Sequence, residues 1–381
     1  MFLEYSDLNK KKVLIRTDYN VQIIENKIQS TKRIDETIKS IKFILNQNPK
    51  QLIIVSHLGR PNINDRSLTL EPVRKYLEST IKKKIILCEL DDITNDKIVM
   101  IENIRFYREE TEDLDSTSDF RKKLTNLCDV FVNDAFGCCH RLHSSIIGIN
   151  VKEKYLGFLI QNEINYLSSV LNTQGVKTLI LGGSKINDKI KLIENLIPKI
   201  DNIIIGGALA FTFLKHMNIN IGDSLLENYN YELVDKIRKL SDVNGTRIIL
   251  PVDFNCNDSF NNDGDLKYFN IFNGINDGYM GLDIGSLSIL TFKTVLKNSN
   301  LIIWNGPLGV CEFDNFSIGS KKIMKFISKL NAKTVIAGGY TISCCEKFKL
   351  SKKMDHVSTG GNASLHMLEG NNLPGIKFIT N

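Results

Sequence analysis

The sequence contains no long apolar run. No run reaches the roughly 18 residues that a membrane-spanning helix needs, and residues 1–20 lack the apolar centre of a secretory signal. Internal repeats and low-complexity linkers are absent as well. These absences predict an intracellular, cytoplasmic protein that makes no contact with a membrane.

Cysteine motifs are also missing. The chain has eight cysteines, but none are arranged with the Cys-x-x-Cys spacing of metal and redox motifs. Cys138 with Cys139, and Cys344 with Cys345, are adjacent pairs, which are poor candidates for a disulfide framework in a chain of this size. We therefore expect the cysteines to be reduced.

A metal centre is the alternative for one of these cysteine pairs. Cys138, Cys139, His140 and His143 are residue types that ligate zinc. Arg141 lies among them, however, and a guanidinium group does not suit the first shell of a cation. We predict no metal ligand from the protein.

A concentrated basic surface is missing too. The formal net charge is +6, but the lysines at 10–12, 82–84 and 351–353 lie in separate short runs. A nucleic-acid partner would predict a basic stripe with interleaved aromatic side chains. The lysine runs are typical of solvated faces, so we predict no nucleic-acid partner.

The sequence does contain a series of short apolar runs, nearly all separated by helical patterns. Continuous apolar runs between helices are typical of parallel strands that are covered on both faces. A chain of 381 residues has room for two domains or one large one. The pattern predicts a doubly wound α/β fold. The predicted strands are Val13–Ile15, Leu52–Val55, Ile98–Ile101, Val130–Val132, Leu179–Leu181, Ile203–Ile205, Ile248–Leu250, Leu301–Trp304 and Thr334–Ile336.

The residues directly after these runs fall into two chemical sets. Ligands of doubly wound sheets bind at the carboxyl ends of the strands, so these residues should carry the function. The first four runs are followed by charged, amide and histidine side chains at 16–20, 56–61, 102–106 and 133–143. Most of the later runs are followed by glycines, at 182–183, 206–207, 306–309 and 338–339.

Arginines are the common element of the first set. Arg16, Arg60, Arg105 and Arg141 all lie just past strand ends, and Arg33 lies at the start of a helix. Guanidinium groups pair with carboxylates and phosphates through two parallel hydrogen bonds. Any one of these arginines alone is typical of an ordinary surface. Their common position predicts a site for a small, multiply charged anion.

The stretch Thr178–Lys189 is the most informative part of the second set. An apolar run ends at Gly182 and Gly183, and a helical pattern follows with Lys185 and Lys189 on one face. Glycines let the backbone approach an anion, and the first N–H groups of a helix favour negative charge. The spacing is neither that of a P-loop nor that of a dinucleotide-binding motif, and a plain turn with solvated lysines is the alternative. Glycine-rich strand ends favour a nucleotide, whose phosphates can lie on main-chain N–H groups.

Ordered blocks along nearly the whole chain resemble the phosphoglycerate kinase family. The blocks are Arg16–Val21, Ser56–Pro61, Glu102–Phe106, Val132–Phe136, His140–Ser145, Gly182–Lys189, Met280–Gly285, Trp304–Glu312 and Val357–Gly361. The resemblance implies a phosphoglycerate-binding domain at 1–155, a connecting helix at 156–172 and a nucleotide-binding domain at 173–372, which close on the substrates. We take the helical pattern over 153–172 as the connector. The resemblance also implies that residues 373–381 return to the first domain.

The activity that the resemblance implies is reversible phosphoryl transfer from ATP to the carboxylate of 3-phosphoglycerate. In glycolysis the reaction runs from ADP and 1,3-bisphosphoglycerate toward ATP. Mg²⁺ would arrive with the adenine nucleotide, and the protein would be a monomer. Such a transfer depends on alignment and charge neutralisation, and a carboxylate acceptor needs no general base.

The matching motifs also imply site residues. Those for phosphoglycerate would be Asp18, Asn20, Arg33, His57, Arg60, Arg105 and Arg141. Those for the nucleotide would be Gly182, Gly183, Lys185, Lys189, Gly207, Asn305, Gly306, Leu308, Glu312, Gly338, Gly339 and Thr341, with Glu312 at the ribose. Arg33, Lys185 and the helix N-terminus at Gly361 would act on the transferring group.

The sequence departs from the family pattern mainly in the nucleotide half. Tyr340 stands where the family has an aspartate that faces the metal-bound nucleotide, and Ala337 and Asn362 replace glycines. A phenol cannot replace a carboxylate as a ligand of Mg²⁺. A catalytically impaired homologue that binds phosphoglycerate, or serves as an interaction protein, is therefore a second hypothesis. Retention of Arg33 and Lys185 favours the enzyme.

Overall fold

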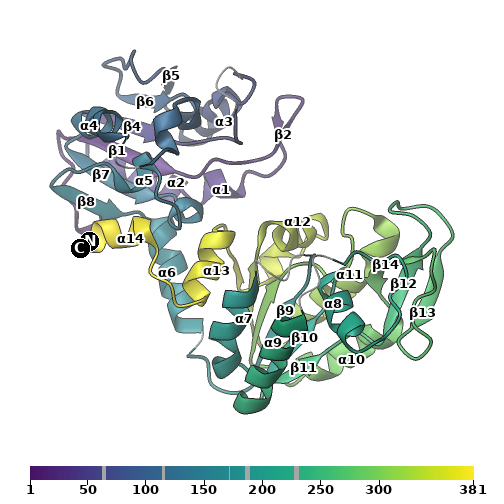
Figure 1. Cartoon of the computed structure of the whole chain (residues 1–381). Helices are drawn as coiled ribbons and strands as arrows, with labels where there is room; N and C mark the ends of the chain where they lie inside the picture. The colour runs from purple at the N-terminus through teal and green to yellow at the C-terminus, as the bar shows by residue number, and fades with distance from the viewer. Residues whose placement is uncertain (62–65, 114–115, 171, 185–188, 227–230) are drawn as a thin grey trace. The chain divides into compact units, whose positions relative to one another are not determined.

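The computed structural model describes residues 1–61, 66–113, 116–170, 172–184, 189–226 and 231–381. The chain divides into two compact units: unit 1 is Met1–Asn165 with Asn371–Asn381, and unit 2 is Tyr166–Gly370. Each unit contains a six-stranded sheet with helices packed around it (Figure 1). The doubly wound α/β prediction is confirmed. Among the described residues, the helices are too short or too polar to cross a membrane.

The sheet of unit 1 is parallel throughout and has the order β5-β6-β4-β1-β7-β8. All of β1 after its first residue is buried, as expected for a strand covered on both faces. Because β4 and β7 flank β1, the residues after these three strands meet at one edge of the sheet. The strands are β1 (Lys12–Thr17), β4 (Gln51–Val55), β5 (Ile86–Cys88), β6 (Ile98–Ile101), β7 (Val130–Asp134) and β8 (Glu153–Leu156).

The helices of unit 1 bury apolar residues such as Ile41 and Leu77 in one core with Val13 and Ile15 of β1. The last helix, α14 (Pro374–Thr380), packs against β8 and α5, so the end of the chain lies in unit 1 (Figure 1). The other elements of this part are η1 (Leu3–Tyr5), the hairpin β2 (Ile23–Ile24) and β3 (Lys27–Ile28), α1 (Lys32–Asp35), α2 (Ile38–Asn46), α3 (Glu71–Ile81), η2 (Ile104–Phe106), η3 (Arg108–Glu110), α4 (Ser118–Asn126), η4 (Phe136–Cys138), α5 (Ser144–Ile147) and α6 (Phe158–Val170).

The sheet of unit 2 is also parallel, with the order β11-β10-β9-β15-β16-β17. The strand order reverses between β9 and β15, and ligands of such sheets bind outside the carboxyl ends at this point. The strands are β9 (Lys177–Leu181), β10 (Asn202–Ile205), β11 (Arg247–Ile249), β15 (Leu301–Asn305), β16 (Lys333–Ala337) and β17 (His356–Val357).

Unit 2 has a second, antiparallel sheet with the order β13-β12-β14. Its strands are β12 (Asp253–Asn257), β13 (Lys267–Asn270) and β14 (Met280–Ile284). The helices are α7 (Ile190–Leu196), η6 (Ile197–Lys199), α8 (Leu209–His216), α9 (Tyr231–Asn244), α10 (Ser286–Leu296), η7 (Asp314–Phe316), α11 (Ile318–Ile327), α12 (Gly339–Lys347), η8 (Ser351–Lys353) and α13 (Asn362–Leu368).

Each strand predicted from an apolar run is present, but the helical interpretation of 153–172 was wrong at its start. Residues Glu153–Leu156 form β8, which pairs with β7, and helix α6 begins only at Phe158. The first two residues of β8 are half-exposed because the strand lies at the sheet edge. An edge strand therefore lacks the continuous apolar run that marks a central one.

The expectation that all cysteines are reduced was also wrong. Cys311, in the loop after β15, and Cys344, in α12, form a disulfide with their Cα atoms 5.9 Å apart. The two residues are 33 positions apart in the sequence, so no short motif announces the pair. The fold joins them because β15 and β16 are neighbours in the sheet.

Candidate active site

Arginines gather around a buried histidine at the carboxyl edge of the sheet in unit 1. His57 follows β4 and is 2% exposed. Its pKa lies well below the ordinary value, first because of burial and then because Arg16, Arg105, Arg141 and Arg33 oppose its protonation. We call these four arginines the basic cluster. Their convergence on one point agrees with the predicted anion site.

Arg16 has a different position from the one the sequence indicated. It lies within β1, not past its end, and is fully buried. Its Nε donates to Ser145 Oγ at 2.7 Å, and its Nη2 donates to Glu110 Oε1 at 3.5 Å. Counting Arg16 with the residues past strand ends was therefore wrong, because it lies inside β1. Its donors are also used within the protein. Its charge still contributes to the cluster.

Arg16 also fixes the proton of His57. The Nη2 of Arg16 lies 3.4 Å from Nδ1 of His57. A guanidinium group can only donate hydrogen bonds, so Nδ1 acts as the acceptor and the neutral ring carries its proton on Nε2. His57 thus offers one N–H donor, without a titratable charge near neutral pH.

Glu110 pairs with Arg16 of the basic cluster and was not identified from the sequence. It is fully buried and accepts hydrogen bonds from the backbone N–H of Ser145 at 2.8 Å and from its hydroxyl at 2.7 Å. Burial raises its pKa, while the Arg16 charge opposes that rise. In the sequence, Glu110 lies beside Glu109 with nothing to distinguish the two. Only the fold shows which of them is buried.

Arg33 reaches the cluster from α1. Its Nη1 donates to Asp18 Oδ2 and to the carbonyl oxygen of Asn20, both at 3.1 Å. The amide oxygen of Asn20 in turn accepts from the N–H of Gly59 at 2.8 Å. The Arg33 side chain is 30% exposed, so part of its guanidinium group can still meet a ligand.

Arg105 has a buried hydrogen-bond donor that needs an acceptor. Its Nη1 donates to the carbonyl of Gly59 at 2.5 Å, whereas its buried Nε has no hydrogen-bond partner among the described residues. Burial, followed by the charges of Arg141 and Arg16, lowers the pKa of Arg105 to about 10. Leaving such a donor unpaired is costly, and a bound anion would pair it.

The remaining predicted arginines differ in placement. Arg141 is half-buried and its Nε donates to Nε2 of His140 at 3.2 Å. Arg60 is exposed after Gly59, and no contact given for the described residues joins it to the basic cluster. Of the five arginines considered from the sequence, four therefore belong to the basic cluster and Arg60 does not.

Metal-ligating side chains do meet in this region, though not in the set considered from the sequence. Asp18, His57 and Cys138 have potential ligand atoms within 4.8 Å of one another. The same arginine charges that oppose a proton on His57 also oppose a divalent cation. Burial raises the pKa of the Cys138 thiol to about 11, so it is not a ready thiolate ligand. The electrostatics favour an anion.

Unit 2 has a cavity of about 550 Å³ outside the carboxyl ends of β9, β10 and β15. Its walls are largely apolar, and it includes four of the residues predicted for the nucleotide. Its size and lining are typical of a small-molecule site. The lining includes Gly183, Gly207, Leu308, Glu312, Phe211, Leu225, Phe254, Leu282, Val310 and Tyr340.

The glycines at and beside this cavity pack the loops after β9 and β15 against each other. Gly182 donates its N–H to the carbonyl of Asn305 and Gly183 donates to that of Pro307, both at 2.9 Å. Gly306 has a φ of +94°, and a Cβ there would lie 2.1 Å from the carbonyl oxygen of Gly182. The N–H groups of Gly182 and Gly183 are therefore used within the protein, and the first turn of the helix predicted after them lies outside the described residues.

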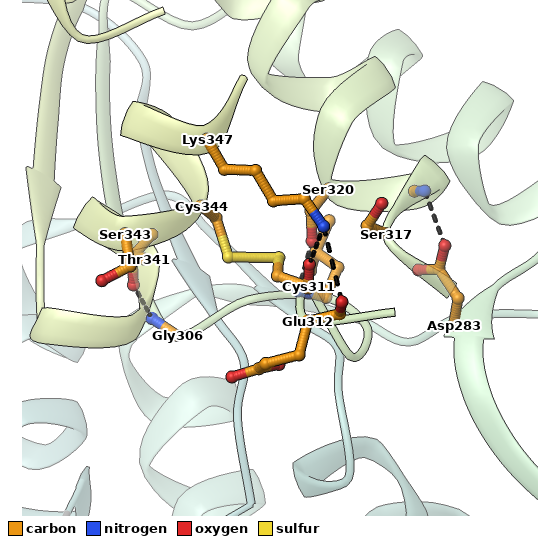
Figure 2. Close-up of a disulfide and its surroundings, with 12 residues drawn as sticks. Asp283, Gly306, Cys311, Glu312, Ser317, Ser320, Thr341, Ser343, Cys344 and Lys347 are labelled. Atoms are coloured by element: carbon orange, nitrogen blue, oxygen red, sulfur yellow. Dashed lines mark hydrogen bonds between the residues drawn. A yellow bond between two sulfur atoms is a disulfide. The ribbon is translucent and has the colours of Figure 1, made fainter. Parts of the chain in front are cut away.

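The first turn of α12 provides the other glycine-rich edge. Gly338 precedes the helix with a φ of +86°, and Thr341 Oγ1 accepts the N–H of Gly306 at 2.6 Å (Figure 2). Gly339 has open space where a Cβ would lie. Tyr340 is 74% exposed and lines the cavity. The N-terminus of α12 therefore borders the site.

Charge is distributed in unit 2 differently from unit 1. The described part of the cavity lining carries the carboxylates of Asp223, Asp283 and Glu312 and neither lysine nor arginine. Burial raises the pKa of Asp283 to about 8, against the hydrogen bond from Gly319 N–H at 2.7 Å. Lys185 lies outside the described residues. A Cβ built on Gly183 would lie 3.8 Å from Nζ of Lys189, so this lysine is near the cavity wall.

Comparisons with known proteins agree over the whole chain. A family model described as Phosphoglycerate kinase matches residues 3–371. The phosphoglycerate kinase of Drosophila melanogaster is 40% identical over 406 residues, covering 99% of this chain and 98% of the relative. That of Tetrahymena thermophila is 39% identical over 401 residues, covering 98% of this chain and 96% of the relative. Among solved structures, phosphoglycerate kinase from Coxiella burnetii has a TM-score of 0.86 at 32% identity and covers 100% of this chain and 98% of that one.

Proposed function

The chain belongs to the phosphoglycerate kinase family, and on that premise we propose which residues bind each substrate. It is a phosphotransferase that moves a phosphoryl group reversibly between ATP and the carboxylate of 3-phosphoglycerate. The full-length match does not favour the alternative of a catalytically impaired binding protein.

The observation that carries the proposal is the basic cluster around neutral His57. A 3-phosphoglycerate molecule has a phosphate at one end and a carboxylate at the other, and both need donors. Arg105, with its unpaired buried Nε, and Arg141 would hold the phosphate. His57 would donate from Nε2, and Arg33 would lie at the carboxylate end. Asp18, Asn20 and Arg60 complete the proposed set, since Asp18 and Asn20 orient Arg33.

The cavity of unit 2 is the proposed nucleotide site. Its apolar walls suit the adenine base, and the exposed carboxylate of Glu312 would accept hydrogen bonds from the ribose hydroxyls. The N–H groups of Gly339 to Thr341 at the start of α12 would face the phosphates. Lys185 and Lys189 would supply positive charge. Gly182, Gly183, Gly207, Asn305, Gly306, Leu308 and Gly338 would shape the wall.

In this mechanism the protein aligns the two substrates and neutralises the charge on the transferring phosphoryl group. A carboxylate oxygen of 3-phosphoglycerate attacks the γ-phosphorus, and the bond to the β-phosphate oxygen breaks, with no proton to remove. Arg33, Lys185 and the helix N-terminus at Gly361 would neutralise charge on the moving group. Mg²⁺, when bound to the nucleotide phosphates, would offset their charge. Because Arg33 belongs to unit 1 and Lys185 to unit 2, the mechanism requires the two bound substrates to meet during turnover.

The residues present fit a nucleotide better than they fit a protein-held metal. The cavity has the size and apolar lining for a base, but Tyr340 occupies the border position where a carboxylate would serve Mg²⁺. Asp283 is not a substitute, because its oxygens accept the N–H groups of Gly319 and Ile284. We propose that Mg²⁺ is held by the phosphates and water.

Calorimetric titrations of paired variants test this assignment. Glu312→Gln should weaken binding of ADP and leave 3-phosphoglycerate binding unchanged, whereas Arg105→Gln should do the reverse. Arg108→Gln, at an exposed arginine paired with Glu112, is the matched control and should change neither. Loss of both ligands in either variant would argue against separate sites. ATP consumption that does not depend on 3-phosphoglycerate would argue against the acceptor.

We also propose a cytoplasmic monomer, as the family resemblance implies. Sedimentation equilibrium at micromolar concentration should give the mass of one chain, 43.2 kDa. A mass that rises with protein concentration would contradict the monomer and show that the protein assembles. Fractionation of cells that express the protein would test the compartment in the same way.

A further inference from the structure

We propose that Cys311 and Cys344 form a reversible dithiol–disulfide switch on the nucleotide site. The inference rests on the proposed function of the cavity in unit 2. The disulfide joins the loop after β15 to helix α12, and both segments carry residues that border the cavity (Figure 2). Making or breaking this bond therefore changes how firmly two cavity walls are held together.

The bridge lies next to the proposed nucleotide contacts. Cys311 directly precedes Glu312 and follows Val310, and both of these neighbours line the cavity. Cys344 lies in the same helix as Tyr340, which also lines it. The two cysteines are 4% and 2% exposed, so their sulfur atoms are packed behind the cavity wall and do not form part of the binding surface.

Other contacts tie the same two segments, and these would persist after reduction. Lys347 Nζ donates to the carbonyl of Cys311 at 2.9 Å and forms an ion pair with Asp314 at 2.8 Å. Thr341 accepts from the N–H of Gly306 at 2.6 Å. Figure 2 shows the hydrogen bond of Lys347 to Cys311 and that of Gly306 to Thr341 on either side of the disulfide. Reduction should therefore loosen the loop and leave the fold of unit 2 in place.

The rest of the chain favours reversibility. Cys88, Cys128, Cys138, Cys139 and Cys256 carry free thiols. Proteins that combine many free thiols with an occasional disulfide are typical of reducing compartments, where such a bond is commonly regulatory. A permanent framework would be expected to use more of the cysteines.

The exchange reaction balances with a dithiol as the reductant. One thiolate of the dithiol attacks a sulfur of the bridge, the Cys311–Cys344 bond breaks, and the leaving cysteine takes up a proton. The second thiol of the reagent then attacks the mixed disulfide and releases the other cysteine as a thiol. The protein gains two electrons and two protons, and the dithiol leaves as a disulfide. Because both sulfur atoms are buried, attack requires the loop around Cys311 to open first.

The oxidised form should bind ADP more tightly. The bridge holds the loop with Glu312 against α12 before the nucleotide arrives, so less ordering is needed on binding. On reduction we expect the Kd for ADP to rise roughly threefold to tenfold, the scale of losing the pre-ordering of one or two groups. Binding of 3-phosphoglycerate to unit 1 should not change.

The test is calorimetric titration of ADP into the full chain, oxidised with oxidised dithiothreitol or reduced with dithiothreitol. Alkylation followed by mass measurement should find two more thiols after reduction. Cys311→Ser and Cys344→Ser should bind ADP like the reduced protein and ignore the reagent. Cys88→Ser, which changes a half-buried thiol in unit 1, is the control and should keep the full response. If the serine variants fold poorly, the Kd for ADP of the wild-type chain in its two redox states still tests the switch.

Linkage provides an independent measurement. If the oxidised form binds ADP fivefold more tightly, saturating ADP must shift the dithiol–disulfide equilibrium fivefold toward the disulfide, or about 20 mV for two electrons. Equal Kd values in the two redox states, no shift with ADP, or equal thiol counts would each overturn the switch. Absence of ADP binding in both states, with 3-phosphoglycerate still bound, would instead overturn the nucleotide site on which the switch rests.

Discussion

The two units have the same kind of sheet but use it in opposite ways. In unit 1, the strand ends carry long charged side chains, and buried hydrogen bonds join Arg16, Glu110 and Ser145. In unit 2, backbones meet at glycines such as Gly182 and Gly306, and the cavity they enclose is mostly apolar. The comparison teaches that one fold can gather charged side chains at its strand ends or shape a cavity with main chain. The first site should be sensitive to charge and the second to added volume.

The largest expected effect is on the charge side of this comparison. Arg33→Ala should lower kcat on the order of 100- to 1,000-fold, because one preorganised donor to developing charge is worth about that much. Binding of 3-phosphoglycerate should fall far less, since Arg105 and Arg141 remain. Steady-state kinetics with 3-phosphoglycerate varied at saturating ATP would separate the two effects.

Arg108→Ala is the matched control for that prediction. Arg108 is exposed, and its Nε lies 3.8 Å from Glu112 Oε1, so its removal takes away one arginine charge outside the cluster. It should leave kcat within about twofold, as surface changes normally do. An equal loss in kcat and in affinity for Arg33→Ala would contradict a role confined to the transition state.

The volume side of the comparison predicts the next effect. Gly306→Ala should destabilise unit 2 by about 2–4 kcal/mol, because a left-handed φ and backbone contacts at 2.1 Å both oppose a methyl group. Gly339→Ala should change stability by less than about 0.5 kcal/mol, since nothing lies within 4 Å of its Cβ position. Chemical denaturation of the two variants measures the difference. Similar losses would mean that space is not what these glycines provide.

The same contrast explains what was predictable. Apolar runs mark central strands such as β1 and β15 directly, and a shared position past strand ends marks Arg105 and Arg141. The use of Gly182 to pack against Pro307 could not be read from the sequence, because a glycine that faces a ligand and one that faces a loop look alike. The burial of Glu110 and the bond between Cys311 and Cys344 depend on contacts between distant segments, which no local pattern encodes.

Buried titratable groups should make the stability of the units respond to pH in different ways. Asp283 in unit 2 has its pKa raised to about 8 by burial. Between its ordinary value of 3.8 and that value the unfolded chain binds fewer protons, so stability falls as pH rises, by up to about 1.4 kcal/mol per unit. Asp283→Asn should remove this slope from unit 2.

Unit 1 has two titratable groups whose pKa shifts change its stability in opposite directions as the pH changes. Burial raises the pKa of Asp134 to about 7, but burial and the charges of Arg16, Arg105 and Arg141 lower that of His143 to about 3. Below its ordinary value of 6.5 the unfolded histidine binds a proton that the folded one does not, so this stability is lost as pH falls. Hydrogen exchange of β1 and β15 amides at pH 5, 6 and 7 should show a steeper decline for unit 2. Parallel slopes would contradict it.

The smallest expected effect comes from adding a carboxylate beside the mostly apolar cavity of unit 2. Tyr340→Asp places a carboxylate at the border of the proposed nucleotide cavity, where it would meet a Mg²⁺ ion carried by the phosphates. Because this position is 74% exposed, solvent screens the new charge, and we expect Mg-ADP to bind only about twofold to fivefold more tightly. Metal-free ADP should bind slightly less well, because the new charge repels the phosphates. Titrations with Mg²⁺ and with a chelator measure both.

Tyr340→Asn decides what such a change would mean. Asparagine has nearly the shape of aspartate without its charge, so it removes the aromatic ring and adds no negative group. If it tightens Mg-ADP as much as Tyr340→Asp does, the ring obstructs the site and the carboxylate is irrelevant. If only the aspartate tightens binding of Mg-ADP, its carboxylate contacts the ion, and Tyr340 leaves that contact unmade. If neither change alters binding of Mg-ADP, the phosphates and water already satisfy the ion.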